Sequence, residues 1–216
     1  MSVIEWIEGP LWQLSSWIFL VFAGWRLFAI VTTGRRARQM PPQGSANLGA
    51  LRMVMSRFLP AKILNRTGRS WFTFIAGYAF HLGFFALLIF AAPHAAFIKS
   101  HIADMEVPVL PRWGFILAAE IAFAGLVALW VRRFVDPVVR NITRADDHIS
   151  TGLTFFVMLT GCMALGEQSE TLRVIHLVFV ELWLVYFPFS SLMHTFTWLL
   201  SRLYTGAAAG RRGVNW

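Results

Sequence analysis

Residues 113–131 read WGFILAAEIAFAGLVALWV, nineteen positions in which the only charged side chain is that of Glu120. A helix that crosses the hydrocarbon core of a bilayer needs about 20 mostly apolar residues, so this run is long enough to span a membrane. Four further apolar runs predict spanning helices at about residues 11–32, 71–98, 149–165 and 172–200. The sequence therefore predicts an all-α membrane protein, a bundle of five transmembrane helices.

The composition of the 216-residue chain agrees with this prediction. Hydrophobic residues make up 57% and charged residues only 14%, whereas soluble domains have about 25% charged residues. This excludes a disordered chain, a nucleic-acid binder and an ordinary soluble enzyme, although the formal net charge is +8. The single cysteine, Cys162, excludes an intrachain disulfide, a Cys-ligated iron–sulfur cluster and a c-type haem attachment motif. Short connections and the lack of repeats favour one domain over residues 1–216.

The basic residues between the apolar runs predict the orientation in the membrane. Segment 33–70 carries eight Lys or Arg and no acidic residue, segment 132–148 carries four Arg, and the tail after residue 200 carries three. Because cytoplasmic loops are enriched in Lys and Arg, the N-terminus is predicted outside and the C-terminus in the cytoplasm of a multi-pass protein of the inner (plasma) membrane. In loop 33–70, Leu48–Leu59 predicts an amphipathic helix that either rests on anionic headgroups or docks a cytoplasmic subunit.

The histidines carry the candidate chemistry, because ionisable side chains inside a membrane are costly and often functional. His176 and His194 are 18 residues apart. On one unbroken helix they share a face and lie about 27 Å apart, which would suit two b-type haems near opposite membrane surfaces. His81 stands in the middle of the second apolar run, and imidazoles on facing helices can supply axial ligands. The alternative for each is a proton relay or a hydrogen bond between helices.

Three motifs carry a family resemblance. They are FHLG at 80–83, RRF at 132–134 followed by Pro137 and Arg140, and HLV at 176–178 with FPFSSLMH at 187–194. Together they resemble the gamma subunit (cytochrome b) of membrane-bound respiratory nitrate reductase and related gamma-like subunits of heterodisulfide-reductase-like complexes. The resemblance implies five spans, an outside N-terminus, haem b, quinone chemistry and a cytoplasmic iron–sulfur or catalytic partner subunit.

The resemblance also implies ligands. His81 and His194 would bind the haem nearer the cytoplasm, and His176 the haem nearer the outside. The family's second outer ligand falls at a position that is Ala91 here. Three alternatives follow: His94 is a substitute ligand, the outer haem is absent, or another group binds it. We favour a His94–His176 pair.

His94 lies 13 residues after His81, about 140° around an unbroken helix, unless Pro93 breaks or kinks the helix and changes that angle. The two remaining histidines, His101 and His148, are expected in loops or interfaces.

Other charged residues complete the candidate site. Arg26, Arg132 and Arg133 are expected towards the cytoplasm, where they either bind haem propionates or only anchor the helices. Glu120, Glu181 and Lys99 are candidates for proton transfer or quinone binding, and Glu181 is alternatively a protonated helix contact.

The sequence thus predicts an electron-transfer subunit with one or two b haems, using quinone as a diffusible substrate and contacting membrane lipids but no nucleic acid. It is not catalytic alone, because it has no cysteine set for a relay. The alternatives are a haem-free proton-conducting or carrier protein that uses His and Glu relays, and an anchor that has lost its haem.

Overall fold

The computed structural model describes residues 2–33, 41–56, 68–167 and 169–214, and within them the regular structure is entirely helical. Five helical segments are long and apolar enough to cross a membrane, which confirms the all-α class and five candidate spans. The side on which each terminus lies stays a prediction. The five segments are Val3–Thr33, Trp71–Phe90, Arg112–Val135, Ala145–Leu165 and Glu170–Phe189.

The chain divides into two compact units, residues 1–67 with 181–216, and residues 68–180. Each is described here by itself, and the interpretation as one domain stays a prediction. Most of the basic residues of loop 33–70 lie outside the described residues, as do positions 57–59 of the expected amphipathic helix. The described part of that helix is α3 (Ala46–Met55).

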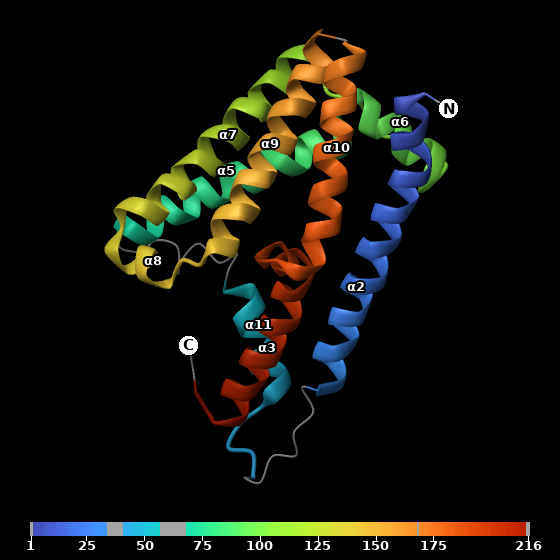
Figure 1. Ribbon diagram of the computed structural model, residues 1–216. Coiled ribbons are helices and arrows are strands. Elements are labelled where there is room, and N and C mark those ends of the chain that lie inside the picture. Colours follow the sequence, from blue (N-terminus) through green and yellow to red (C-terminus); the bar gives the residue numbers. More distant parts are fainter. Residues whose placement is uncertain (1, 34–40, 57–67, 168, 215–216) are drawn as a thin grey trace. The chain divides into compact units, whose positions relative to one another are not determined.

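The unit 68–180 contains α5 (Gly68–Phe90), α6 (Ala92–His101), α7 (Arg112–Val135), α8 (Pro137–Ile142), α9 (Ala145–Glu167) and the first part of α10 (Glu170–Tyr186). Helices α5 and α7 lie side by side (Figure 1). Their backbones approach closely because each helix places a glycine against the other. A Cβ on Gly83 of α5 would lie 2.6 Å from the Ala118 carbonyl oxygen, and a Cβ on Gly125 of α7 would lie 2.6 Å from the Ala76 carbonyl oxygen. Small residues permit this packing in membranes, where burial of apolar surface drives association little.

The expected helix 71–98 is interrupted, which corrects the sequence interpretation. Helix α5 ends at Phe90, Ala91 is extended with ψ of 139°, and α6 begins at Ala92. Pro93 explains the break, because it has no N–H to donate to the Ile89 carbonyl and its ring would clash with that carbonyl in a continuous helix. The angle calculated for an unbroken helix therefore does not apply to His94.

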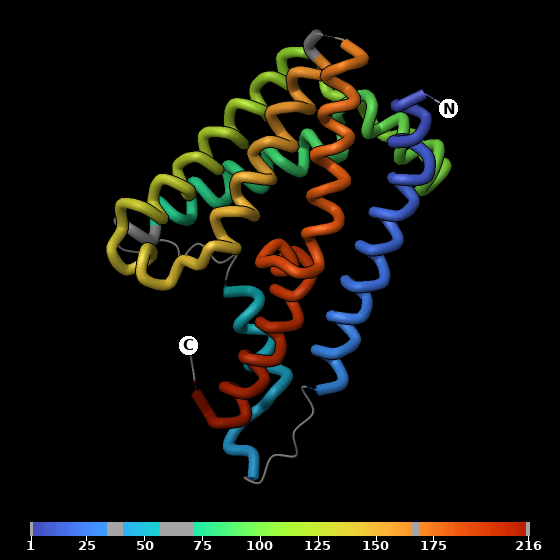
Figure 2. Tube along the Cα trace, viewed as in Figure 1, coloured from blue at the N-terminus to red at the C-terminus, as the bar shows by residue number. Residues whose placement is uncertain are grey.

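The unit formed by residues 1–67 and 181–216 contains α1 (Val3–Trp6), a short π turn at Ile7–Leu11, α2 (Trp12–Thr33), α3, the end of α10, and α11 (His194–Arg211). Helices α3 and α11 pack against each other (Figure 2). A Cβ on Gly49 would clash with the backbone of Gly206 and Gly210, so glycine is required at this crossing.

The contact between α3 and α11 agrees with the number of spans. Helix α3 follows the first spanning segment and α11 follows the fifth. Four crossings between them return the chain to the side on which it started, so the two helices can meet on one membrane surface. An odd number of crossings between them would place them on opposite sides.

The expected fifth helix, 172–200, is also interrupted, and the prediction that His176 and His194 share one unbroken helix is wrong. Helix α10 ends at Tyr186, two 3₁₀ turns follow at Phe187–Phe189 and Ser191–Met193, and α11 begins at His194. Pro188 explains the end of α10, because a proline in a helix interior removes a hydrogen bond and clashes with the preceding turn. The 27 Å separation of the two imidazoles therefore no longer follows.

Candidate histidine site

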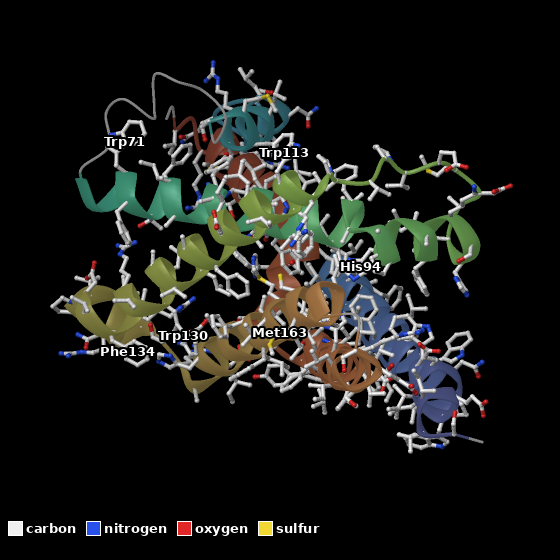
Figure 3. All side chains as sticks on the ribbon, turned by 90° about the horizontal axis from the view of Figure 1, so that it is seen from above. Trp71, His94, Trp113, Trp130, Phe134 and Met163 are labelled. Carbon is white, nitrogen blue, oxygen red and sulfur yellow. The ribbon has the colours of Figure 1, made fainter. Side chains whose placement is uncertain are left out.

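His94 and His176 are brought together within the unit 68–180. His94 is the third residue of α6 (labelled in Figure 3), and His176 lies on α10. Their ring centres are 6.3 Å apart and their planes are inclined by 28°. The break at Ala91 makes this possible, because it frees α6 from the direction of α5. The sequence motif had marked Ala91 as the missing ligand position, and the structure places His94 beside His176 instead.

The surroundings of His176 fix the direction of its ring. Its Nδ1 lies 3.2 Å from the hydroxyl oxygen of Thr160, which itself lies 2.7 Å from the Phe156 carbonyl oxygen. Because that carbonyl can only accept, the hydroxyl donates to it and accepts from His176 Nδ1–H. Gly161 leaves the space for the ring, since a Cβ there would lie 2.9 Å from His176 Cε1.

The other three histidines proposed as ligands also hold a proton on Nδ1. His94 Nδ1 lies 3.1 Å from the Leu87 carbonyl oxygen. His81 Nδ1 lies 2.7 Å from the carbonyl oxygen of Gly77, and His194 Nδ1 2.7 Å from that of Ser191. A carbonyl oxygen only accepts, so each Nδ1 donates and the lone pair is on Nε2. Metal-bound histidines are usually oriented in this way by a hydrogen bond from the second ring nitrogen.

The remaining histidines are held differently. Trp130 Nε1–H donates to His148 Nδ1 at 3.1 Å, and the ring of Phe134 stacks on the imidazole with centres 4.8 Å apart (both aromatic residues are labelled in Figure 3). The lone pair of His148 Nδ1 is therefore used within the protein, and Nε2 carries the proton. His101 is exposed and stacks on Phe97, with ring centres 4.6 Å apart.

His81 and His194 belong to different units, and their pairing stays a prediction. His81 lies near the middle of α5 with its ring 4.8 Å from that of Phe80, and His194 is the first residue of α11. Both side chains are exposed in the described structure.

The three arginines expected at haem propionates each contact protein groups. Arg132 forms an ion pair with Asp136 at 3.2 Å and also donates to Thr73. Arg133 lies 3.6 Å from an Asp147 carboxylate oxygen. Arg26 donates from Nη1 to the Pro188 carbonyl oxygen at 2.6 Å. A propionate contact by any of them stays a prediction.

The proton and quinone candidates differ strongly in burial. Glu120 is exposed on α7, and Lys99, in the last turn of α6, is paired with Glu106. Glu181 on α10 is only 4% exposed, and neither carboxylate oxygen has a hydrogen-bond partner among the described residues. Glu181 is therefore the one of the three whose surroundings are unusual.

The separation of the His94 and His176 ring centres is close to that of two imidazoles that bind one metal from opposite sides, and the two rings are stacked with planes inclined by 28°. An imidazole nitrogen binds a metal at about 2.0 Å and the ring centre lies about 1.1 Å behind it, so two imidazoles on opposite sides of a metal have centres about 6.2 Å apart. The observed separation is 6.3 Å. No group of three or more His, Cys, Asp or Glu lies together among the described residues. Haem iron needs only two axial ligands, because the porphyrin supplies the other four.

Sequence reasoning did not identify what supports the histidines. The contacts of the histidines with the Leu87 carbonyl and Thr160, and that of Arg26 with the Pro188 carbonyl, are evident only in the structure. Pro93 and Pro188 were the available signals, because a proline inside an apolar run marks the place where backbone carbonyls need new donors.

Comparisons with known proteins assign no family to the chain. No protein-family model matches it, and no solved structure matches it. A curated protein of Nitratidesulfovibrio vulgaris (strain Hildenborough), named only "Protein", is 26% identical over 157 residues, which cover 71% of this chain and 68% of that protein. The similarity extends over most of both chains, and the name of the relative states no function.

Proposed function

We propose that the chain is a haem b-binding membrane subunit of a respiratory oxidoreductase. In this proposal it transfers electrons between the quinone pool and a cytoplasmic iron–sulfur partner subunit. The observation that carries the proposal is the pair His94 and His176, whose rings are 6.3 Å apart and whose lone pairs are on Nε2. The motifs shared with the gamma-like cytochrome b subunits support it further.

The residues of this chain would bind and orient the cofactor. A bound haem supplies a one-electron iron couple, and bis-histidine ligation by two neutral imidazoles suits electron transfer. His94 and His176 would hold the iron, the Leu87 carbonyl and Thr160 would keep the two Nδ1 protons in place, and Gly161 would leave room for the ring of His176. The second proposed ligand pair, His81 and His194, has the same orientation of its lone pairs.

The proposed orientation in the plasma membrane follows from charge. The described α3 and α11 pack together and belong to two segments, 33–70 and the tail after residue 200, that carry basic but no acidic residues. The positive-inside rule places this surface in the cytoplasm, where the partner subunit would dock. Both directions of electron flow, quinol oxidation and quinone reduction, are compatible with the arrangement.

Haem content of the purified protein tests the proposal. We expect b-type bands in the dithionite-reduced visible spectrum and one or two haems per chain by pyridine haemochrome. His176→Ala and His94→Ala should remove one of these haems, whereas His148→Ala and His101→Ala should leave the content unchanged. A wild-type protein purified from a haem-replete membrane without any haem contradicts the proposal.

Glu181 favours one second candidate, a haem-free proton-conducting protein. A carboxylate that is 4% exposed within a span and has no hydrogen-bond partner among the described residues is a possible proton-binding group. Proton flux into vesicles that contain the purified protein, abolished by Glu181→Gln and accompanied by no haem bands, would favour this function. Absence of both haem and flux would leave a structural anchor.

A further inference from the structure

The break between α10 and α11 creates backbone groups that need partners. Pro188 lies at the end of the fifth spanning segment and is fully buried. Where water is excluded, an unsatisfied carbonyl is strongly unfavourable, so irregular backbone at membrane depth persists only when other protein groups complete its hydrogen bonds. The Pro188 carbonyl lies outside any α-helix, whereas that of Ser190 already accepts from the Met193 amide at 3.3 Å.

Arg26 donates to the Pro188 carbonyl from the first spanning segment. Its Nη1 lies 2.6 Å from the Pro188 carbonyl oxygen and 3.4 Å from that of Ser190. An arginine within a span is itself unfavourable unless its N–H groups find acceptors. The Arg26 guanidinium and the Pro188 carbonyl, which are 162 residues apart in the sequence, therefore meet each other's need for a hydrogen-bond partner.

The hydrogen bonds continue from this turn to His194. Buried Ser190 accepts from the Leu192 amide at 3.2 Å and donates to the Phe187 carbonyl oxygen at 3.0 Å. The next carbonyl, that of Ser191, lies 2.7 Å from His194 Nδ1. The backbone that Arg26 holds is thus the backbone that orients the imidazole.

We propose that Arg26 is a positioning residue for His194. Its guanidinium fixes the 187–193 turn, the turn fixes the Ser191 carbonyl, and that carbonyl fixes the tautomer and the direction of the His194 ring. The inference rests on the proposed function in so far as His194 is a haem ligand. It differs from both roles considered from the sequence, in which Arg26 either bound a haem propionate or only anchored its helix.

Two substitutions at position 26 test whether the hydrogen-bond donors of the arginine side chain are required. Arg26→Met removes every donor, and Arg26→Lys keeps a positive charge and one donor group. Arg140→Met, on α8, is the matched control for loss of a single arginine. The haem ligated by His194 is identified as the electron paramagnetic resonance signal that disappears in His194→Ala. This signal reports the orientation of the His194 ring, because the spectrum of ferric bis-histidine haem depends on the angle between the two imidazole planes.

We expect Arg26→Met to lose most of the His194-dependent signal and to retain the His176-dependent one. Arg26→Lys should keep the haem with a shifted His194-dependent signal, and Arg140→Met should match the wild type. Unchanged signals in both Arg26 variants overturn the inference. If Arg26→Met cannot be purified, the His194-dependent signal of Arg26→Lys decides. A shifted signal supports the inference, and an unchanged signal overturns it.

A haem-free wild type would refute the proposed function without deciding this inference. In that case ¹⁵N nuclear magnetic resonance of labelled histidine tests it directly, since the two tautomers of a neutral imidazole have different nitrogen shifts. The His194 signal, assigned as the one missing in His194→Ala, should show the Nδ1–H form in the wild type and a tautomer mixture in Arg26→Lys. The same tautomer in both proteins overturns the inference.

Discussion

Two helix breaks in this chain are built alike and completed differently. At Ala91 and at Pro188 an apolar helix is interrupted beside a proline, and a histidine stands in the first turn of the helix that follows. At the first break, His94 itself donates to the Leu87 carbonyl, and the Leu110 amide donates to that of Phe90 at 2.9 Å. At the second break, the donor to the Pro188 carbonyl is Arg26, which belongs to a different helix.

The two breaks differ in whether one residue or two serve as proposed haem ligand and as hydrogen-bond donor to the backbone. Near Ala91 the proposed ligand itself donates to a carbonyl of the preceding helix, that of Leu87, which also accepts from the Ala91 amide at 3.2 Å. Near Pro188 the proposed ligand His194 is oriented by a backbone that a remote arginine holds. We therefore expect removal of the His94 side chain to change stability and haem together, and substitutions at the second break to change them separately.

The largest expected effect is loss of one haem on substitution of the His94–His176 pair. His94→Ala, His176→Ala and the double variant should each lose the same haem, because a bis-histidine iron loses its site when either ligand is removed. The effects are therefore strongly non-additive. Pyridine haemochrome of the three proteins measures this, and a double variant that loses two haems would refute the pairing.

His94→Asn separates ligation from the hydrogen bond to Leu87. The asparagine amide can donate to the Leu87 carbonyl from nearly the position of Nδ1, but it does not replace the imidazole as a ligand. We expect both variants to lack the haem, and His94→Asn to be more stable than His94→Ala by about 1 kcal/mol, the typical net contribution of one hydrogen bond. Chemical denaturation in detergent measures the difference, and equal stabilities would show that the hydrogen bond is not needed at the break.

The next effect distinguishes the two prolines. Pro93→Ala allows α5 to continue through Ala91, which would turn His94 away from His176 and weaken binding of the haem proposed for this pair, while costing little stability because Pro93 is exposed. Pro188→Ala removes buried volume and should lower the free energy of unfolding by about 1–3 kcal/mol, but Arg26 and Ser190 still hold the turn, so the His194-dependent signal should persist. Haem spectra and denaturation of the two variants provide the test. The reverse result, with haem lost only in Pro188→Ala, would contradict the comparison.

The sequence predicted the five spans because length and apolar composition are sufficient for that purpose. It did not predict where α5 and α10 end. A proline inside an apolar run allows either a kink or a break, and tertiary donors decide which of them forms. Arg26 could not be recognised as such a donor, since its partner is a backbone carbonyl 162 residues away and carbonyls have no sequence signature.

The candidate ligands were predictable and their support was not. His94 and His176 were paired from the motif that left Ala91 without a ligand, and the structure places their rings together. The contact between Gly161 and the His176 ring depends on the rotation of α9 relative to α10, and apolar periodicity fixes that rotation poorly in helices that face lipid on one side and protein on the other.

A smaller effect is expected from Gly161→Ala. The added Cβ would lie 2.9 Å from His176 Cε1, so the ring must move by several tenths of an ångström. We expect the haem to be retained with a shifted spectrum and midpoint potential. Gly24→Ala is the matched control, because nothing lies within 4 Å of a Cβ there, and it should be neutral or stabilising by about 0.5–1 kcal/mol. Identical potentials in Gly161→Ala and the wild type would show that the imidazole is not confined by α9.

The smallest effect on the haem is expected at the second break, from Ser190→Ala. Its hydroxyl is buried and makes two hydrogen bonds within the turn, to the Phe187 carbonyl and from the Leu192 amide, so its removal should lower the free energy of unfolding by about 1–2 kcal/mol. Ser15→Ala is the control, because that buried hydroxyl bonds only the Trp12 carbonyl one turn earlier on α2, a carbonyl the helix ladder already satisfies. Because Arg26 remains, the His194-dependent signal should broaden without being lost. A complete loss of that signal in Ser190→Ala would show that Ser190, rather than Arg26, holds the turn.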